Sequence, residues 1–319
     1  MNLLPATATK TFSLLSIGQR GVGKTVFLAG SHAELHPDNH SGNPQKFWFD
    51  CQDSDVQANL DKIKNHIART GSYPPATIKI TNFNFSLKRQ SLEGVKTICH
   101  FRWWDVPGEA CNVHNLDFQE MILNSNGCCV FINAHALIHD KNYPRLLEDI
   151  FNQVAAIASV GYMYNIQYAF ALILTKCDLL ELNPATKQKI EQDLQPLLTY
   201  LDTVKAAYQT FYSAIPIISV AGVPSLSPSG AANPLLWLLS RLNDSVDAPS
   251  EQVLASKSSQ DLPTKKKEST ETRKYILIIS LLGVGLLGAI ASFFFAFNLS
   301  NPVPRQVPIP APNPTQPAN

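Results

Sequence analysis

A run of eight residues near the N-terminus has the residue types and spacing that hold phosphate. It fits the pattern GxxxxGK[ST] and reads Gly18-Gln19-Arg20-Gly21-Val22-Gly23-Lys24-Thr25. The glycines let backbone N–H groups turn toward phosphate oxygens, and a helix start adds a favourable partial charge. We expect Lys24 to reach the β- and γ-phosphates and the Thr25 hydroxyl to bind Mg²⁺. The run therefore predicts nucleotide binding.

A second candidate site lies where a later apolar stretch ends in an acidic residue. Asp105 closes the stretch Phe101-Arg102-Trp103-Trp104, and Gly108 follows three residues on. A carboxylate at the end of a core strand beside a phosphate loop supplies the hard oxygen ligand that Mg²⁺ prefers. The metal site predicted from the sequence therefore combines Thr25 with Asp105.

A third element, Thr175-Lys176-Cys177-Asp178, follows an apolar run at residues 169–174. Together with the phosphate loop and the Asp105/Gly108 spacing, it resembles the Ras-like, translation-factor-related P-loop GTPases. The resemblance implies that Asp105 contacts Mg²⁺ through water and that the Gly108 amide senses the γ-phosphate. It also implies that Asp178 accepts hydrogen bonds from guanine N1–H and the 2-amino group, while the Lys176 stem packs over the base. A buried carboxylate without those donors is costly, which would discriminate against adenine. Thr175 stands where Asn is commoner, which weakens one supporting contact.

The same resemblance implies two further elements that match more loosely. Thr77, which precedes an expected strand, is the candidate for ordering over Mg²⁺ and the γ-phosphate, with Thr81 as a weaker competitor. Ser219 and Val220 are the candidates for a loop against the guanine; their alternative is an ordinary turn at a strand end.

Hydrolysis depends on the residue after Gly108. Many relatives have glutamine there to orient the attacking water, whereas this chain has Glu109, whose charge repels the γ-phosphate. We therefore expect slow intrinsic hydrolysis, with Lys24, Thr77, Gly108 and Glu109 as the candidate catalytic residues. Arg20 lies inside the loop and is a candidate for contributing positive charge to hydrolysis, although the simpler interpretation is that its side chain faces solvent.

These residues are compatible with three alternative functions. The first is a membrane-anchored GTP/GDP switch, and the second is a scaffold or receptor subunit that stays bound to GTP. The third, an ATP-dependent enzyme, is disfavoured by Asp178. The implied cofactors are GTP or GDP and Mg²⁺, and the effector is unknown.

The elements that must position these residues alternate along the chain. Strands are expected at residues 11–17, 77–87, 95–103, 128–132, 168–174 and 214–219, and helices at 25–36, 54–70, 116–124, 144–159, 185–208 and 233–242. Such alternation predicts an α/β fold with a mostly parallel central sheet flanked by helices, and the resemblance implies that this fold is a P-loop NTPase. One domain is expected over residues 10–243.

Beyond this domain the composition changes sharply. Residues 275–297 contain no charged side chain, and 23 helical residues span about 34 Å against a hydrocarbon core of about 30 Å. The sequence thus predicts a flexible basic linker over 244–274, a transmembrane helix over 275–298 and a Pro-rich tail over 299–319. Basic residues concentrate before the span, including Lys265, Lys266 and Lys267, so the large domain is expected in the cytoplasm. That lysine run is expected to set the topology, with contact to anionic lipid as the alternative.

The predicted span has two pairs of small residues four positions apart, Gly285 with Ala289 and Gly288 with Ser292. Such pairs let two membrane helices pack closely, so a homodimer is one alternative. The net charge of +1 argues against an extended nucleic-acid surface. The six cysteines have no metal-ligand spacing and predict reduced thiols.

Overall fold

The computed structural model describes residues 9–35, 47–75, 81–92, 94–106, 111, 115–164, 166 and 168–247. The chain divides into two compact units, Met1–Pro249 and Ser250–Asn319. All described residues belong to the first unit, and the structure of that unit alone is considered below.

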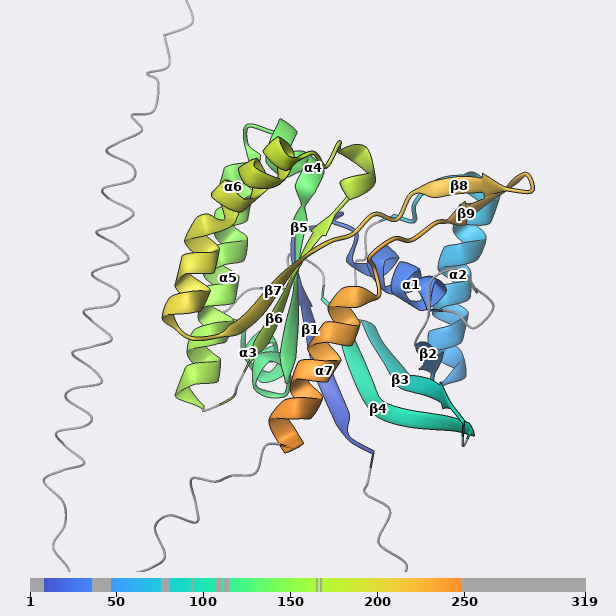
Figure 1. Cartoon of the computed structure of the whole chain (residues 1–319), viewed down its shortest axis with the longest axis horizontal. Helices are drawn as coiled ribbons and strands as arrows, with labels where there is room; N and C mark the ends of the chain where they lie inside the picture. Colours follow the sequence, from blue (N-terminus) through green and yellow to red (C-terminus); the bar gives the residue numbers. More distant parts are fainter. Residues whose placement is uncertain are drawn as a thin grey trace, which may run out of the picture. The chain divides into compact units, whose positions relative to one another are not determined.

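Seven strands of the described residues form one sheet in the order β2-β3-β4-β1-β5-β6-β7 (Figure 1). They are β1 (Thr11–Ile17), β2 (Phe47–Cys51), β3 (Thr81–Ser91), β4 (Gly94–Asp105), β5 (Gly127–Asn133), β6 (Ala169–Thr175) and β7 (Ala207–Tyr212). Strands β4, β1, β5, β6 and β7 pair in parallel, whereas β3 runs antiparallel to both β2 and β4.

The predicted fold class is wrong, because the sheet is mixed rather than mostly parallel. Strands β3 and β4 form a hairpin whose last pair is Ser91 opposite Gly94, and two strands joined by so short a turn must run antiparallel. β2 then extends the antiparallel edge. In addition, no helix among the described residues is long and apolar enough to cross a membrane. The predicted span at residues 275–297 lies outside those residues.

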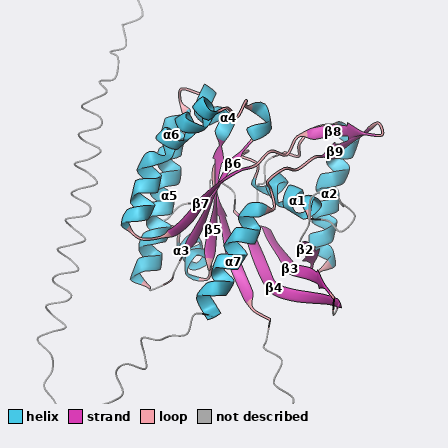
Figure 2. Ribbon diagram, in the orientation of Figure 1, coloured by secondary structure: helices cyan, strands magenta, loops and turns pink. Residues whose placement is uncertain are grey.

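Helices cover the two faces of the sheet (Figure 2). One apolar core joins α1 (Lys24–Glu34), α2 (Ser54–Thr70) and α7 (Asn233–Asp247) to the sheet. The other core joins α3 (Leu116–Leu123), α5 (Tyr143–Met163) and α6 (Pro184–Thr203) to the opposite face. Each core is built of fully buried aliphatic and aromatic side chains, with Trp103 of β4 in the first.

The structure adds elements that periodicity did not predict. These are β2, the short helix α4 (Ala134–His139), and a separate hairpin of β8 (Ile217–Val220) and β9 (Val223–Leu226). The strand expected at 214–219 is displaced, since β7 already ends at Tyr212. The cause is an earlier end of α6: Ala206 N–H donates to the Leu201 carbonyl at 2.9 Å, and Lys205 adopts a left-handed conformation that closes the helix.

Candidate functional site

The loop that follows β1 has backbone geometry that only glycine adopts readily. Gly18 has φ +141°, and a Cβ built there would lie 2.7 Å from the Phe131 carbonyl oxygen of β5. Gly23 has φ +105°. The loop thus passes against β5, the neighbour of β1 on the side away from β4. In the strand order β1 lies between β4 and β5, so the connection from β1 leads to one side of it and the connection from β4 leads to β5 on the other. Open α/β sheets bind ligands where the strand order changes direction in this way.

Helix α1 begins directly after this loop, and its cap differs from those of α2, α3, α4 and α6. Asp53, Asn115, Asn133 and Asn183 each accept a backbone N–H at the start of α2, α3, α4 and α6, respectively. The N-cap of α1 is Gly23, which has no side chain to accept one. The first turn of α1 therefore presents N–H groups and the positive end of the helix dipole to an anion.

Lys24 lies folded across the loop rather than extended into solvent. Its Nζ donates to the carbonyl oxygens of Gly18 at 2.8 Å and Gln19 at 3.2 Å, and the residue is 6% exposed. Burial and two carbonyl partners hold the ammonium group at one place. A phosphate in the loop would meet a fixed positive charge.

Thr25 and Asp105 meet behind the loop. The Thr25 hydroxyl donates to Asp105 Oδ2 at 2.6 Å, and Asp105 is fully buried at the end of β4. The parallel register sets Asp105 opposite Ser16, two residues before the loop starts. Hydroxyl and carboxylate oxygens fit Mg²⁺, which is usually held by one or two protein oxygens together with phosphate and water. Among the described residues there is no cluster of three or more His, Cys, Asp or Glu that could hold a metal.

The end of β6 forms the other side of the site. The Thr175 hydroxyl donates to the Val22 carbonyl at 2.8 Å, which ties this strand to the phosphate loop. Lys176 has φ +58° and turns the chain into a short 3₁₀ helix, Cys177–Leu179. Asp178, in this turn, is exposed at the rim.

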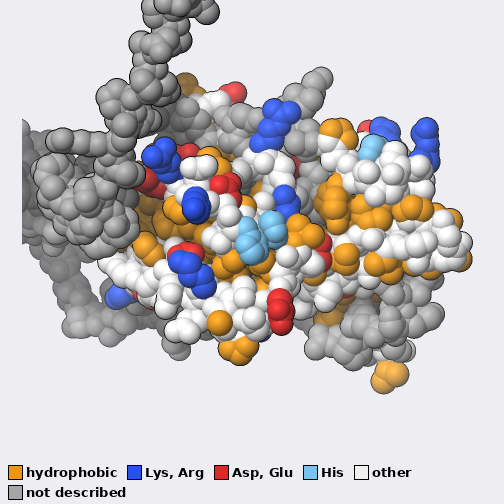
Figure 3. Space-filling view, turned by 90° about the horizontal axis from the view of Figure 1, so that it is seen from above, with side chains coloured by type: hydrophobic (Ala, Val, Ile, Leu, Met, Phe, Trp, Pro, Cys, Tyr) orange, Lys and Arg blue, Asp and Glu red, His pale blue; other side chains and the backbone are white. Residues whose placement is uncertain are grey.

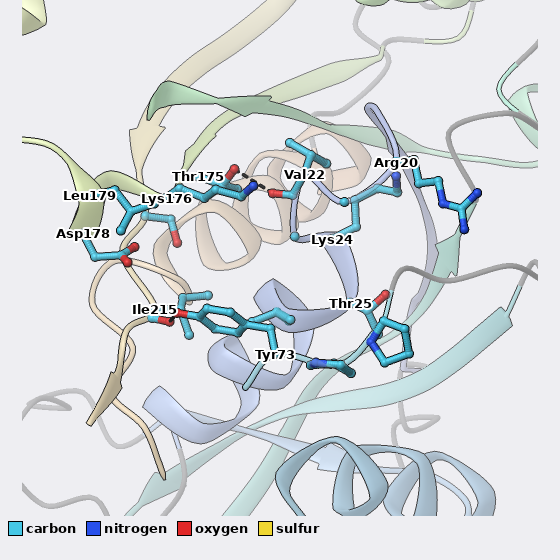
Figure 4. A pocket seen from close by; sticks show the side chains of 16 residues that line it. Arg20, Val22, Lys24, Thr25, Tyr73, Thr175, Lys176, Asp178, Leu179 and Ile215 are labelled. Atoms are coloured by element: carbon cyan, nitrogen blue, oxygen red, sulfur yellow. Dashed lines mark hydrogen bonds between the residues drawn. The ribbon is translucent and has the colours of Figure 1, made fainter. Parts of the chain in front are cut away.

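Both sides open into one cavity of about 380 Å³. Figure 4 shows Asp178 and Lys176 at one end and Thr25 and Arg20 at the other, with Lys24 between them. Figure 3 looks down on this edge of the unit, where basic and acidic side chains lie scattered among apolar and uncharged surface. Comparison of the sequence with protein-family models and with curated proteins finds no match. The function of this domain is therefore inferred from the cavity and the motifs.

The cavity brings together nine of the residues predicted from the sequence, which are Arg20, Gly21, Val22, Gly23, Lys24, Thr25, Thr175, Lys176 and Asp178. Gly18, Gln19 and Asp105 support this lining from behind. Ser219 and Val220 lie instead on β8, where they are exposed and outside the lining. Thr77, Gly108 and Glu109 lie outside the described residues.

Seven of the sixteen lining residues were not predicted from the sequence, among them Ser213, Ile215 and Tyr73. Ser213 and Ile215 follow β7, and Tyr73 comes from the segment after α2. The Ser213 side chain is buried, and its Oγ has no hydrogen-bond partner among the described residues. The signal was the Ser-Ala pair at 213–214, which was overlooked because the preceding strand was expected too late in the chain.

Tyr73 closes the wall between the two ends of the cavity. Its hydroxyl donates to the Ile215 carbonyl at 2.8 Å. Burial, and then the charge of Asp178, raise the pKa of the Tyr73 phenol. The hydroxyl therefore stays protonated and keeps Tyr73 attached to the loop after β7.

Proposed function

We propose that this domain binds GTP together with Mg²⁺ and acts as a GTP/GDP switch. The observation that carries the proposal is the pairing of two chemically different ends in one cavity. One end has a lysine, a helix N-terminus and the Thr25–Asp105 pair, and the other has a carboxylate.

The phosphate end supports a triphosphate because its groups are positive or bind cations. Lys24 supplies a fixed charge, the first turn of α1 supplies N–H donors, and the Thr25–Asp105 pair supplies oxygens for Mg²⁺. When bound, Mg²⁺ would neutralise charge on the phosphate oxygens.

The base end supports guanine over adenine. A carboxylate accepts two hydrogen bonds from N1–H and the 2-amino group of guanine, and adenine has neither donor at those positions. Asp178 is the acid that lines this end. The buried Ser213 hydroxyl adds an uncommitted donor beside it.

Slow hydrolysis is part of the proposal and rests on Glu109 in the sequence. The effector, a possible homodimer and the membrane location predicted from residues 275–297 stay predictions, since the relevant residues lie outside the described part.

Binding of fluorescent GTP and ATP analogues, with Mg²⁺ and with EDTA, tests the proposal. We expect GTP to bind at least a hundredfold more tightly than ATP. The variant Lys24→Met should lose about a hundredfold in GTP affinity, because each charged hydrogen bond contributes about 1.5–3 kcal/mol. Lys62→Met, which removes an exposed lysine of α2, should bind as the wild type does. Equal affinity for the two nucleotides would overturn the assignment of guanine, and binding of neither would overturn the whole proposal.

A further inference from the structure

Two histidines of the short helix α4 lie with their rings in contact. His135 and His139 are four residues apart, so one turn of the helix places both side chains on the same face. Their ring centroids are 4.7 Å apart, and the ring planes make an angle of 50°. His139 is exposed and His135 is partly exposed. The two rings therefore form one pair that solvent and small solutes can reach.

Hydrogen bonds at both ends fix the helix that carries this pair. Asn133 Oδ1 accepts the Ala136 N–H at 3.1 Å, and the Asn133 N–H donates to the buried Tyr143 hydroxyl at 2.7 Å. At the other end, the Asp140 N–H donates to the Ala136 carbonyl at 2.8 Å. Leu137, on the opposite side of the helix from the two histidines, is buried in the core. A ligand of the pair would thus have to order only two side chains, which keeps the entropic cost of binding small.

The ring nitrogens of the pair have no other role within the part of the chain that the structure describes. There, each imidazole contacts the other ring but forms no hydrogen bond or ion pair. All residues from 115 to 164 belong to that part. The next two residues, Asp140 and Lys141, are both exposed and carry opposite charges, and the Asp140 carboxylate accepts the Asn142 N–H at 2.8 Å. The donor atoms, rather than a net charge, therefore decide what the pair can bind.

The distance between the rings fits a metal ion that both rings share. Zn²⁺ binds a histidine nitrogen at about 2.0–2.1 Å, which places the centres of two rings on one ion about 5 Å apart. The observed separation is 4.7 Å. Imidazole suits Zn²⁺, Cu²⁺ and Ni²⁺, whereas Mg²⁺ takes oxygen ligands. Two histidines at this spacing on one helix face also supply two of the zinc ligands in metalloproteases.

Helix α4 lies at the edge of the sheet that carries the nucleotide cavity. It follows directly on β5 and packs against the 3₁₀ helix Cys177–Leu179, which contains Asp178. Figure 1 shows α4 at the end of β5, and Figure 3 shows histidine side chains lying together at the surface of this edge. An ion on the pair would therefore sit beside the element that carries the acid of the base end.

We propose that His135 and His139 form a two-histidine site for a borderline-soft divalent metal ion such as Zn²⁺ or Cu²⁺. Each ring gives the ion one neutral nitrogen, and the remaining coordination positions stay open to water or to a ligand from outside the chain. This site is distinct from the oxygen site of Thr25 and Asp105 and requires neither GTP nor Mg²⁺.

Calorimetric titration of the full chain with Zn²⁺ tests whether both rings hold one ion. All proteins carry Cys51→Ser, because Cys51 is partly exposed whereas the other described thiols are buried. His135→Gln and His139→Gln should each weaken Zn²⁺ binding about tenfold or more, and the double variant should lose little beyond that, because a chelate needs both rings. His66→Gln removes a partly exposed histidine of α2 that has no histidine four residues away, and should leave Zn²⁺ binding unchanged.

Electron paramagnetic resonance with Cu²⁺ counts the nitrogens on the ion without relying on any variant. We expect two imidazole nitrogens in the protein that keeps both histidines and one in each single variant, with circular dichroism melts showing that the variants fold. The chain has eight histidines, so the double variant also tests whether another pair binds the ion. One nitrogen with both histidines present, two nitrogens in the double variant, or unchanged Zn²⁺ affinity in the single variants would each overturn the proposal.

Discussion

The Thr25 hydroxyl donates to Asp105 Oδ2 at 2.6 Å, although 80 residues separate the two in the chain. The pairing of β1 with β4 creates this contact, because it aligns the end of one strand with the end of the other. Thr25, which follows Lys24 in the loop motif, is thereby hydrogen-bonded to a buried carboxylate.

The Thr25 hydroxyl should matter mainly for the Mg²⁺-dependent part of GTP binding. Thr25→Val keeps the shape of the side chain but removes the oxygen, so we expect the gain in affinity that Mg²⁺ provides to fall at least tenfold. Thr25→Ser keeps the oxygen and should retain most of that gain. Titration of fluorescent GTP with and without EDTA measures the difference. A normal Mg²⁺ effect in Thr25→Val would show that this hydroxyl is not a ligand.

Replacing Asp178 should change which purine binds. In Asp178→Asn the side chain presents an amide donor beside an acceptor, which suits xanthine because a carbonyl replaces the 2-amino group of guanine. We expect GTP affinity to fall at least a hundredfold and affinity for xanthosine triphosphate to rise. Competition binding with the two nucleotides measures the exchange. Glu181→Gln removes an exposed acid three residues away and serves as the control. An equal loss of GTP affinity in the two variants would show that Asp178 does not recognise the base.

Gly18 should be intolerant of even a methyl group. In Gly18→Ala the new Cβ would lie 2.7 Å from a carbonyl oxygen and 2.9 Å from the Cβ of Phe131, at φ +141°. We expect the free energy of unfolding to fall by at least about 2 kcal/mol. Gly222→Ala has a positive φ as well but open space around it, and should cost only about 1 kcal/mol. Urea denaturation of both variants measures the contrast, and equal losses would mean that contact with β5 does not constrain the loop.

Buried thiols should make the fold sensitive to alkaline pH. Burial raises the pKa of Cys99 to about 12 and that of Cys177 to about 11, from an ordinary value of 9.0. Above pH 9 these thiols ionise in the unfolded chain but stay protonated in the folded chain. This ionisation lowers the free energy of the unfolded state relative to the folded state. Stability from this source is complete below pH 9 and is lost as pH rises toward 11 to 12, by up to about 1.4 kcal/mol per pH unit for each thiol.

Urea denaturation between pH 7.5 and 10.5 tests this dependence. The unfolding free energy of Cys99→Ala should fall less steeply with pH than that of the wild type. Identical slopes in the two proteins would assign the alkaline loss to other groups.

Local chemistry was predictable from the sequence where neighbouring residues act together. The glycines, Lys24 and Thr25 form one loop, and their backbone and side-chain roles require few distant partners. The same holds for the turn of Thr175 to Asp178, which follows directly on a buried strand. These elements appear in the structure at the predicted places.

Two expectations failed. The sheet is mixed because a short turn joins β3 and β4 into a hairpin and β2 extends its antiparallel edge; the few residues between the strands expected at 77–87 and 95–103 were a local signal that was not used. The loop beside the base end was placed at Ser219 and Val220, whereas Ser213 and Ile215 line the cavity. An error of a few residues at the end of α6 moved the following strand and its loop.

By itself, the sequence determined the glycine-rich loop after β1 and the acid at or just after the end of β4 and β6, since both are set by consecutive residues and by strand periodicity. Only the tertiary structure decided that the Thr25 hydroxyl donates directly to Asp105 Oδ2, that Asp178 is exposed at the rim, and that Tyr73 bonds to Ile215. The physical reason is that these contacts depend on strand order, register and helix packing. Such features emerge from burial of the two apolar cores as a whole and not from any single segment.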